Sequence, residues 1–153
     1  SSMAVAQRYT SPVFSQVNVQ TDQPYSLNIN FLFSDLSDPA TIAADVTVIK
    51  TALATGQQIP TAYYNPFDTT TDVKVSVQNM DIYSPVGDTV TDRPLAIYLH
   101  TGNFLPPGIN GGINGSKNDS SVIAMCTSLA QRGFVAVAPN YRLGWNPLDP
   151  NQF

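Results

Sequence analysis

The sequence predicts an α/β fold, because two short apolar runs flank a helix-like segment. The runs, residues 95–99 and 134–138, are each too short for a core helix but suit strands buried on both faces of a parallel sheet. Between them, Asp119 or Ser120 caps a helix that Gly133 ends. Its apolar positions, expected to face the sheet, are Val122, Ile123, Cys126, Leu129 and Ala130. Strand, helix and strand together form a βαβ unit with parallel strands.

The residues before this unit predict antiparallel strands. Residues 13–19 and 25–33 alternate apolar and polar side chains, and residues 22–24 are expected to break the chain between them. Residues 73–77 alternate in the same way, and residues 80–85 read as a further strand. Residues 87–92 predict a hairpin turn into the apolar run at 95–99. The predicted order is therefore antiparallel first strands that lead into a parallel βαβ sheet.

A helix is predicted over residues 38–55, inside a stretch from 34 to 72. Asp38 suits the N-cap and Pro39 the first turn, while Gly56 is a plausible stop. One apolar stripe follows at helical spacing through Ile42, Val46, Ile49 and Leu53. Residues 57–72 read as a loop. The helix is expected to be a packed surface helix, with the cover of a site mouth as the alternative.

Composition limits the classes of partner. The 153 residues are 42% hydrophobic and 12% charged, which favours a globular chain with a core. A net charge of −4 gives no basic surface for nucleic acid, and no apolar run approaches the ~18 residues of a membrane span. Cys126 is the single cysteine, expected to be a buried packing thiol. Scattered aspartates predict no metal site, and the glycine-rich segment 108–115 lacks the pattern of a phosphate loop.

Two motifs carry a family resemblance. The first, His-Thr-Gly-Asn-Phe at residues 100–104, follows the apolar run at 95–99, and the second, Asn-Tyr-Arg-Leu-Gly at residues 140–144, follows the run at 134–138. Residues 80–85, Met-Asp-Ile-Tyr-Ser-Pro, supply a third similarity. Together they resemble the amino-terminal part of the carboxylesterase and lipase branch of the α/β-hydrolases. That resemblance implies one α/β-hydrolase domain of which residues 1–153 are the amino-terminal part, incomplete alone, with 34–72 as a family-atypical insertion.

The resemblance implies an oxyanion hole in the first motif. Ester hydrolysis develops negative charge on the carbonyl oxygen, and fixed N–H donors stabilise it. The backbone N–H groups of Gly102 and Asn103 take this role by resemblance. Thr101 stands where the family has glycine, and a β-branched residue is strained at positive φ. The hole therefore forms only if Thr101 needs an ordinary φ. Candidates for the substrate pocket are Thr101, Phe104, Tyr63 and Tyr64.

Other motif residues are expected to support the loops. His100, the only histidine, is expected to hold its loop by hydrogen bonding rather than to serve as the base, which comes later in this family. Asn140, Tyr141 and Arg142 resemble the residues that tie the end of the fourth strand to neighbouring loops, and arginine can hold several oxygens at once.

The nucleophile is absent from this sequence. No Gly-x-Ser-x-Gly run occurs, so no triad member is assigned, and no cofactor is expected. The resulting expectation is the amino-terminal part of a serine carboxylic-ester hydrolase. Its partners are the carboxy-terminal remainder, on the same or a separate chain, and a small-molecule, lipid or polymer ester. The alternatives are a non-catalytic binding or adhesion domain, which drift at residues 101 and 103 favours slightly, and a peptidase of the same fold.

The expected location is outside the cytoplasm. Few lysines, many Thr, Asn and Gln, and Asn-x-Ser sites at Asn114 and Asn118 suit a secreted or periplasmic protein. The first residues show no basic segment followed by an apolar one, so no signal peptide is recognised.

Overall fold

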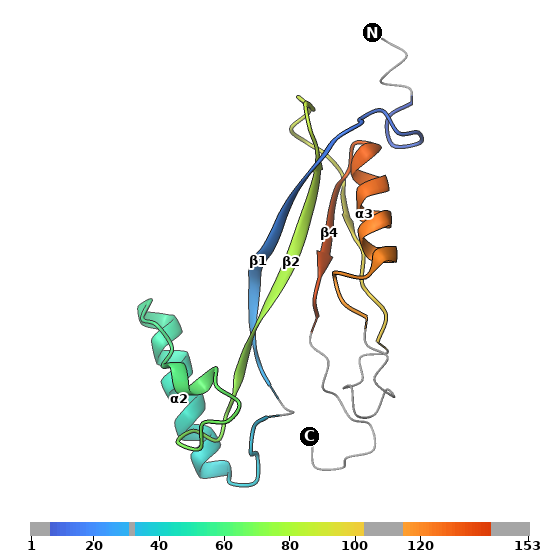
Figure 1. The fold of residues 1–153 in the computed structure, drawn as a ribbon. Helices are drawn as coiled ribbons and strands as arrows, with labels where there is room; N and C mark the ends of the chain where they lie inside the picture. The colour runs from blue at the N-terminus through green and yellow to red at the C-terminus, as the bar shows by residue number, and fades with distance from the viewer. Residues whose placement is uncertain (1–6, 31–32, 103–114, 142–153) are drawn as a thin grey trace.

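The chain folds around a mixed sheet, shown in a computed structural model that describes residues 7–30, 33–102 and 115–141 (Figure 1). The strands are β1 (Val17–Ile29), β2 (Val75–Pro85), β3 (Leu95–Ile97) and β4 (Val135–Pro139), and their order in the sheet is β1-β2-β4-β3. β1 pairs antiparallel with β2, β2 antiparallel with β4, and β3 parallel with β4. This arrangement agrees with the predicted α/β class, in which antiparallel strands lead into a βαβ unit.

Helix α3 (Ser120–Gln131) connects β3 to β4 and covers one face of the sheet (Figure 1). Ala136 and Ala138 alternate onto that face, and their small side chains let the helix approach β4 closely. The main core thus formed consists of Tyr83, Val122, Cys126, Ala130, Ala136 and Ala138. Ile123 was expected to face the sheet but is 41% exposed, because it lies at the edge of the helix face that Val122 and Cys126 bury. Gly133 ends the helix at a φ of 96°.

The face of β3 that points away from α3 is exposed to solvent. Ala96 and Tyr98 pack against the main core, so Leu95, Ile97 and Leu99 alternate onto the side away from α3. These three side chains are 60%, 62% and 51% exposed. The prediction that this run is buried on both faces is therefore wrong in this structure. The reason is that, among the described residues, β3 is an edge strand of the sheet and α3 lies on one of its faces.

The first two strands form a longer ribbon than the sequence predicted. The predicted strands at 13–19 and 25–33 are one strand, β1, and the predicted break at 22–24 is a pair of irregularities in its register with β2. Asp22 takes a φ of 54° there, as the extra residue of a bulge often does. The predicted strands at 73–77 and 80–85 are likewise the single strand β2.

The turn at residues 87–92 is not a hairpin, because β2 and β3 are not neighbours. β4 inserts between them in the sheet. Two ion pairs hold the turn instead, because Arg8 and Arg93 both bind the carboxylate of Asp88. The backbone also joins this region to α3, since the Tyr9 N–H donates to Arg132 O at 2.8 Å.

The segment 34–72 forms an arm at the far end of the β1–β2 ribbon (Figure 1). It holds helix α2 (Pro39–Thr55) and the short 3₁₀ helix η1 (Thr61–Tyr63). The predicted caps of α2 are confirmed: the Asp38 side chain accepts a hydrogen bond from the Ala40 N–H, and Gly56 has a φ of 68°. Within the described residues, neither α2 nor α3 is long and apolar enough to cross a membrane.

The arm has a small core of its own. Its buried residues, from α2, η1 and the segments around them up to the start of β2, are Ile49, Ala52, Ile59, Tyr63, Val73 and Val75. Leu27 and Ile29 of β1 pack against them. Asp45 is buried beneath η1, where its carboxylate accepts from the Tyr63 hydroxyl at 2.9 Å and from the N–H groups of Asp72 and Val73. Leu53 departs from the predicted apolar stripe, because it is 59% exposed beyond the edge of this core.

Candidate functional site

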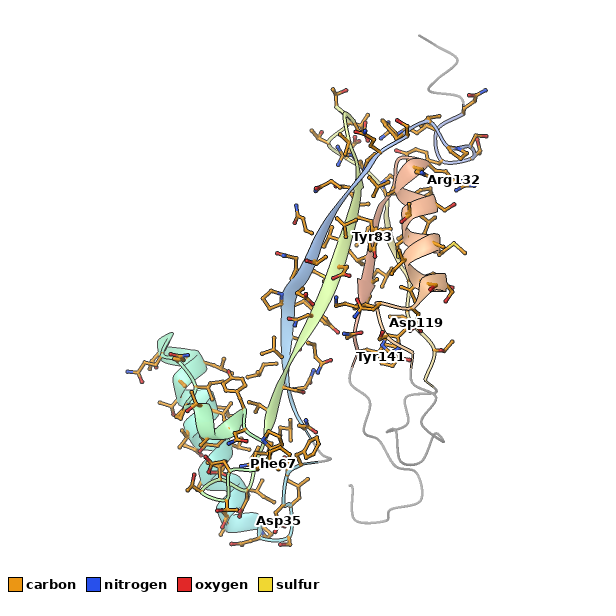
Figure 2. All side chains as sticks on the ribbon, in the orientation of Figure 1. Asp35, Phe67, Tyr83, Asp119, Arg132 and Tyr141 are labelled. Carbon is orange, nitrogen blue, oxygen red and sulfur yellow. The ribbon has the colours of Figure 1, made fainter. Side chains whose placement is uncertain are left out.

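The candidate site is a group of residues at the carboxyl ends of β3 and β4, called here the strand-end cluster. It consists of His100, Thr101, Gly102, Gly115, Lys117, Asn140 and Tyr141. β3 and β4 are parallel, so the segments that follow them leave the sheet at the same edge. Figure 2 shows Tyr141 and Asp119 at this end of the α3–β4 layer and Arg132 at the other.

His100 anchors the loop that follows β3. Its ring stacks on Tyr141, with ring centroids 4.3 Å apart and an interplanar angle of 11°. The Tyr141 hydroxyl donates to His100 O at 2.9 Å, so each residue holds the other. Nδ1 of His100 lies 2.6 Å from Thr101 O, and because a carbonyl only accepts, Nδ1 must carry the proton. This buried histidine links β4 to the loop.

The backbone of the loop explains why threonine is tolerated at residue 101. Gly102 has a φ of 141°, which favours glycine. Among the described residues, the non-glycine positions with positive φ are Tyr9 and Asp22. Thr101 therefore has an ordinary φ, and its branched side chain strains no backbone. Thr101 is exposed while Gly102 is buried.

Gly115 fits directly against Thr101. A Cβ on Gly115 would lie 2.5 Å from Thr101 O, 2.7 Å from its Oγ1 and 2.8 Å from its N. Two of those three atoms are backbone, so they cannot turn away as a flexible side chain does. The segment before α3 therefore touches the loop after β3 through a position that admits only glycine. The sequence showed Gly115 only as part of the glycine-rich segment 108–115, so this contact was not predicted.

Asn140 ties three segments to the end of β4. Its Oδ1 accepts from the Lys117 N–H at 2.8 Å, its N–H donates to Asn79 O at 2.9 Å, and its O accepts from the Tyr25 hydroxyl at 2.9 Å. Burial raises the pKa of the Tyr25 and Tyr141 hydroxyls, so both remain protonated donors near neutral pH. Asn140 is thus a connector between β1, β2 and the segment before α3.

A buried ion pair connects Lys117 of the cluster to Asp81 of β2. Lys117 Nζ is 2.8 Å from Asp81 Oδ1 and 3.0 Å from Asp22 Oδ1. Lys117 and Asp81 are only 5% and 4% exposed, whereas the Asp22 side chain is 67% exposed. Burial would lower the pKa of Lys117, but the bonds to Asp81 and Asp22 outweigh it and raise that pKa above its ordinary value. Lys117 therefore stays charged. The sequence carries no local signal for this pair, whose members are 36 residues apart.

The structure brings together only part of the predicted site. Asn103, Phe104 and Arg142 lie outside the described residues. Tyr63, predicted as a pocket residue, is 4% exposed within the core of the arm, where its hydroxyl serves Asp45. Tyr64 is 40% exposed on the same arm. Tyr63 therefore packs in the arm, at the far end of the ribbon from the strand-end cluster.

Cys126 is buried in the main core, as expected of a packing thiol. Burial, with a smaller effect from Asp81, raises the pKa of this thiol to about 11. Because the thiolate is the reactive form, iodoacetamide at pH 8 should alkylate Cys126 at least tenfold more slowly in the native protein than in urea. Intact mass measured over time checks this prediction. Equal rates in the two conditions would contradict it.

Within residues 7–30, 33–102 and 115–141, no group of three or more His, Cys, Asp or Glu side chains is placed to hold a metal ion. Comparison with protein-family models, with curated proteins and with solved structures found no match for the chain.

Proposed function

We propose that this chain is the amino-terminal part of a serine carboxylic-ester hydrolase of the α/β-hydrolase type, active outside the cytoplasm. The observation that carries the proposal is the loop after β3, where a buried glycine, Gly102, has a φ of 141° and lies two residues after His100. Open α/β sheets bind their ligands at this edge, where loops leave the carboxyl ends of parallel strands. The antiparallel first strands followed by a βαβ unit also support it.

In this proposal the backbone N–H groups of Gly102 and Asn103 stabilise the oxyanion. Such donors lower the barrier when they are already fixed where negative charge develops. The contacts of His100 with Tyr141, and of Gly115 with Thr101, restrict the loop in the way that this role requires. The serine nucleophile, the acid and the base belong to the remainder of the enzyme.

Two further observations support this reading over a non-catalytic binding domain. Thr101 has no positive φ, so the departure from glycine that favoured the binding domain costs no backbone strain. The bare row of Leu95, Ile97 and Leu99 on an edge strand suits a sheet that the remainder of the same enzyme continues and covers. The ester itself, whether small molecule, lipid or polymer, is left to the substrate tests.

The proposal is tested on the full-length protein with p-nitrophenyl acetate. Gly102→Ala places a side chain at a φ that only glycine tolerates, so it displaces a donor N–H and should lower kcat about tenfold. Gly87→Ala is the matched control, because Gly87 also has a positive φ, 79°, with nothing within 4 Å, in the turn after β2. No turnover by the wild type, or equal kcat values for the two variants, would count against the proposal.

A further inference from the structure

Burial of the ion pair between Lys117 and Asp81 costs desolvation free energy that apolar side chains would not cost. Lys117 and Asp81 lie almost entirely out of water, and removing two such charges from water is unfavourable for each ion. An apolar pair of the same size would fill the space without that cost. The pair instead gives the Lys117 ammonium one defined position, because the oxygens that hold it are fixed.

The carboxylate oxygens that bind Lys117 come from the first two strands, β1 and β2. Asp81 belongs to β2, and its Oδ1 also accepts from the Asp22 N–H at 2.9 Å in the irregular part of β1. One carboxylate oxygen thus binds both the bulge of β1 and the ammonium of Lys117. The side chain of Lys117 therefore fixes the segment before α3 to the first two strands.

The backbone of that segment passes the constraint on to the loop after β3. The Lys117 N–H binds Asn140 Oδ1 at the end of β4. Two residues earlier, Gly115 lies against the backbone of Thr101 with no room for a Cβ. Any shift of residues 115–117 away from the sheet would remove the surface on which Thr101 rests, and Gly102 follows Thr101 in the chain.

We infer that Lys117, held by Asp81 and Asp22, is a positioning residue that sets the place of the loop at residues 101 and 102. The inference about position stands on the contacts alone. Its consequence for kcat rests on the proposed ester hydrolysis, in which that loop carries oxyanion donors. A residue that acts in this way should affect the loop without loosening the sheet.

The test is amide hydrogen exchange of the full-length protein, followed by mass spectrometry. The main variant is Lys117→Met combined with Asp81→Asn, which leaves no buried charge unpaired and an amide that can still accept from the Asp22 N–H. We expect exchange of residues 99–102 to be at least tenfold faster, with unchanged exchange in β4. Lys50→Met, at an exposed position on α2, is the control and should change neither.

Two outcomes would overturn the inference. Exchange of residues 99–102 at the wild-type rate would show that the loop does not depend on Lys117. Faster exchange in every segment, β4 included, would show a general role in folding. Lys117→Arg keeps the charge and should restore most of the protection.

The kinetic measurement separates this inference from the proposed function. On p-nitrophenyl acetate, the double variant should lose about tenfold in kcat at an unchanged KM, because misplaced donors affect the transition state more than binding. If the exchange result is as expected but the wild type hydrolyses no ester, the position of the loop stands and the proposed function fails. If the wild type is active and the double variant keeps its kcat, the kinetic role of Lys117 fails.

Discussion

Gly115→Ala should disturb the strand-end cluster more than a methyl group added at any other position. The added Cβ would meet Thr101 O at 2.5 Å, and relief requires movement of one backbone segment or the other. We expect a loss of about 2 kcal/mol in the free energy of unfolding from overpacking. Displacement of the loop should also lower kcat toward esters by roughly 100-fold. Urea denaturation and ester turnover of the full-length protein measure the two effects.

Gly56→Ala is the control for that experiment. Gly56 has a φ of 68° and nothing within 4 Å of a Cβ, so alanine there adds backbone strain without a clash. It should cost about 1 kcal/mol of stability and leave kcat unchanged, because Gly56 ends α2 in the arm. A Gly115→Ala variant that keeps wild-type kcat would show that the contact with Thr101 does not position the loop.

Asp88→Asn should cause the second large effect, on stability. Asp88 binds Arg8 through both oxygens, at 3.0 and 2.5 Å, and Oδ2 lies 2.7 Å from Arg93 Nε. Its side chain is only 3% exposed. Removal of the carboxylate leaves two arginines without their charged partner and should cost roughly 3 kcal/mol at pH 7. Asp92→Asn, in the same turn but exposed, should cost little.

The pH dependence of this effect has a definite sign. The hydrogen bond from Arg8 lowers the pKa of Asp88 to about 2, against the opposing effect of burial and with smaller help from Val90 and Arg93. A carboxyl group whose pKa is lower in the folded state adds stability above its unfolded pKa, near 4, and loses it toward its folded pKa. The stability difference between wild type and Asp88→Asn should therefore shrink between pH 4 and pH 2. A constant difference would contradict the role of Asp88.

The elements that the sequence predicted well are those fixed by nearby residues. The caps of α2, Asp38 and Gly56, act within one turn of the helix, so their types alone place its ends. The βαβ unit was also predictable, because periodicity changes between residues 95–99 and 120–131. The break at 22–24 was wrong because a bulge and a loop use the same polar residues, and only the pairing with β2 distinguishes them.

The candidate site was predictable only where a motif marks it. His100, Asn140 and Tyr141 were singled out through the two motifs, and the structure places His100 against Tyr141. Gly115 and Lys117 were not, because their roles depend on the approach of segments distant in sequence. Nothing near Lys117 indicates that Asp81 is its partner. The sequence could not place Tyr63, because an aromatic residue in a loop gives the same pattern whether it lines a pocket or packs in a core.

The central claim, that these residues belong to a serine ester hydrolase, is tested most directly with a fluorophosphonate probe. The probe reacts covalently with an activated serine and can be located by mass spectrometry of the full-length protein. We expect one probe per protein molecule, on a serine within Gly-x-Ser-x-Gly outside residues 1–153, and no labelling after heat denaturation. No labelling of the native protein, or labelling of a serine within residues 1–153, would contradict the claim.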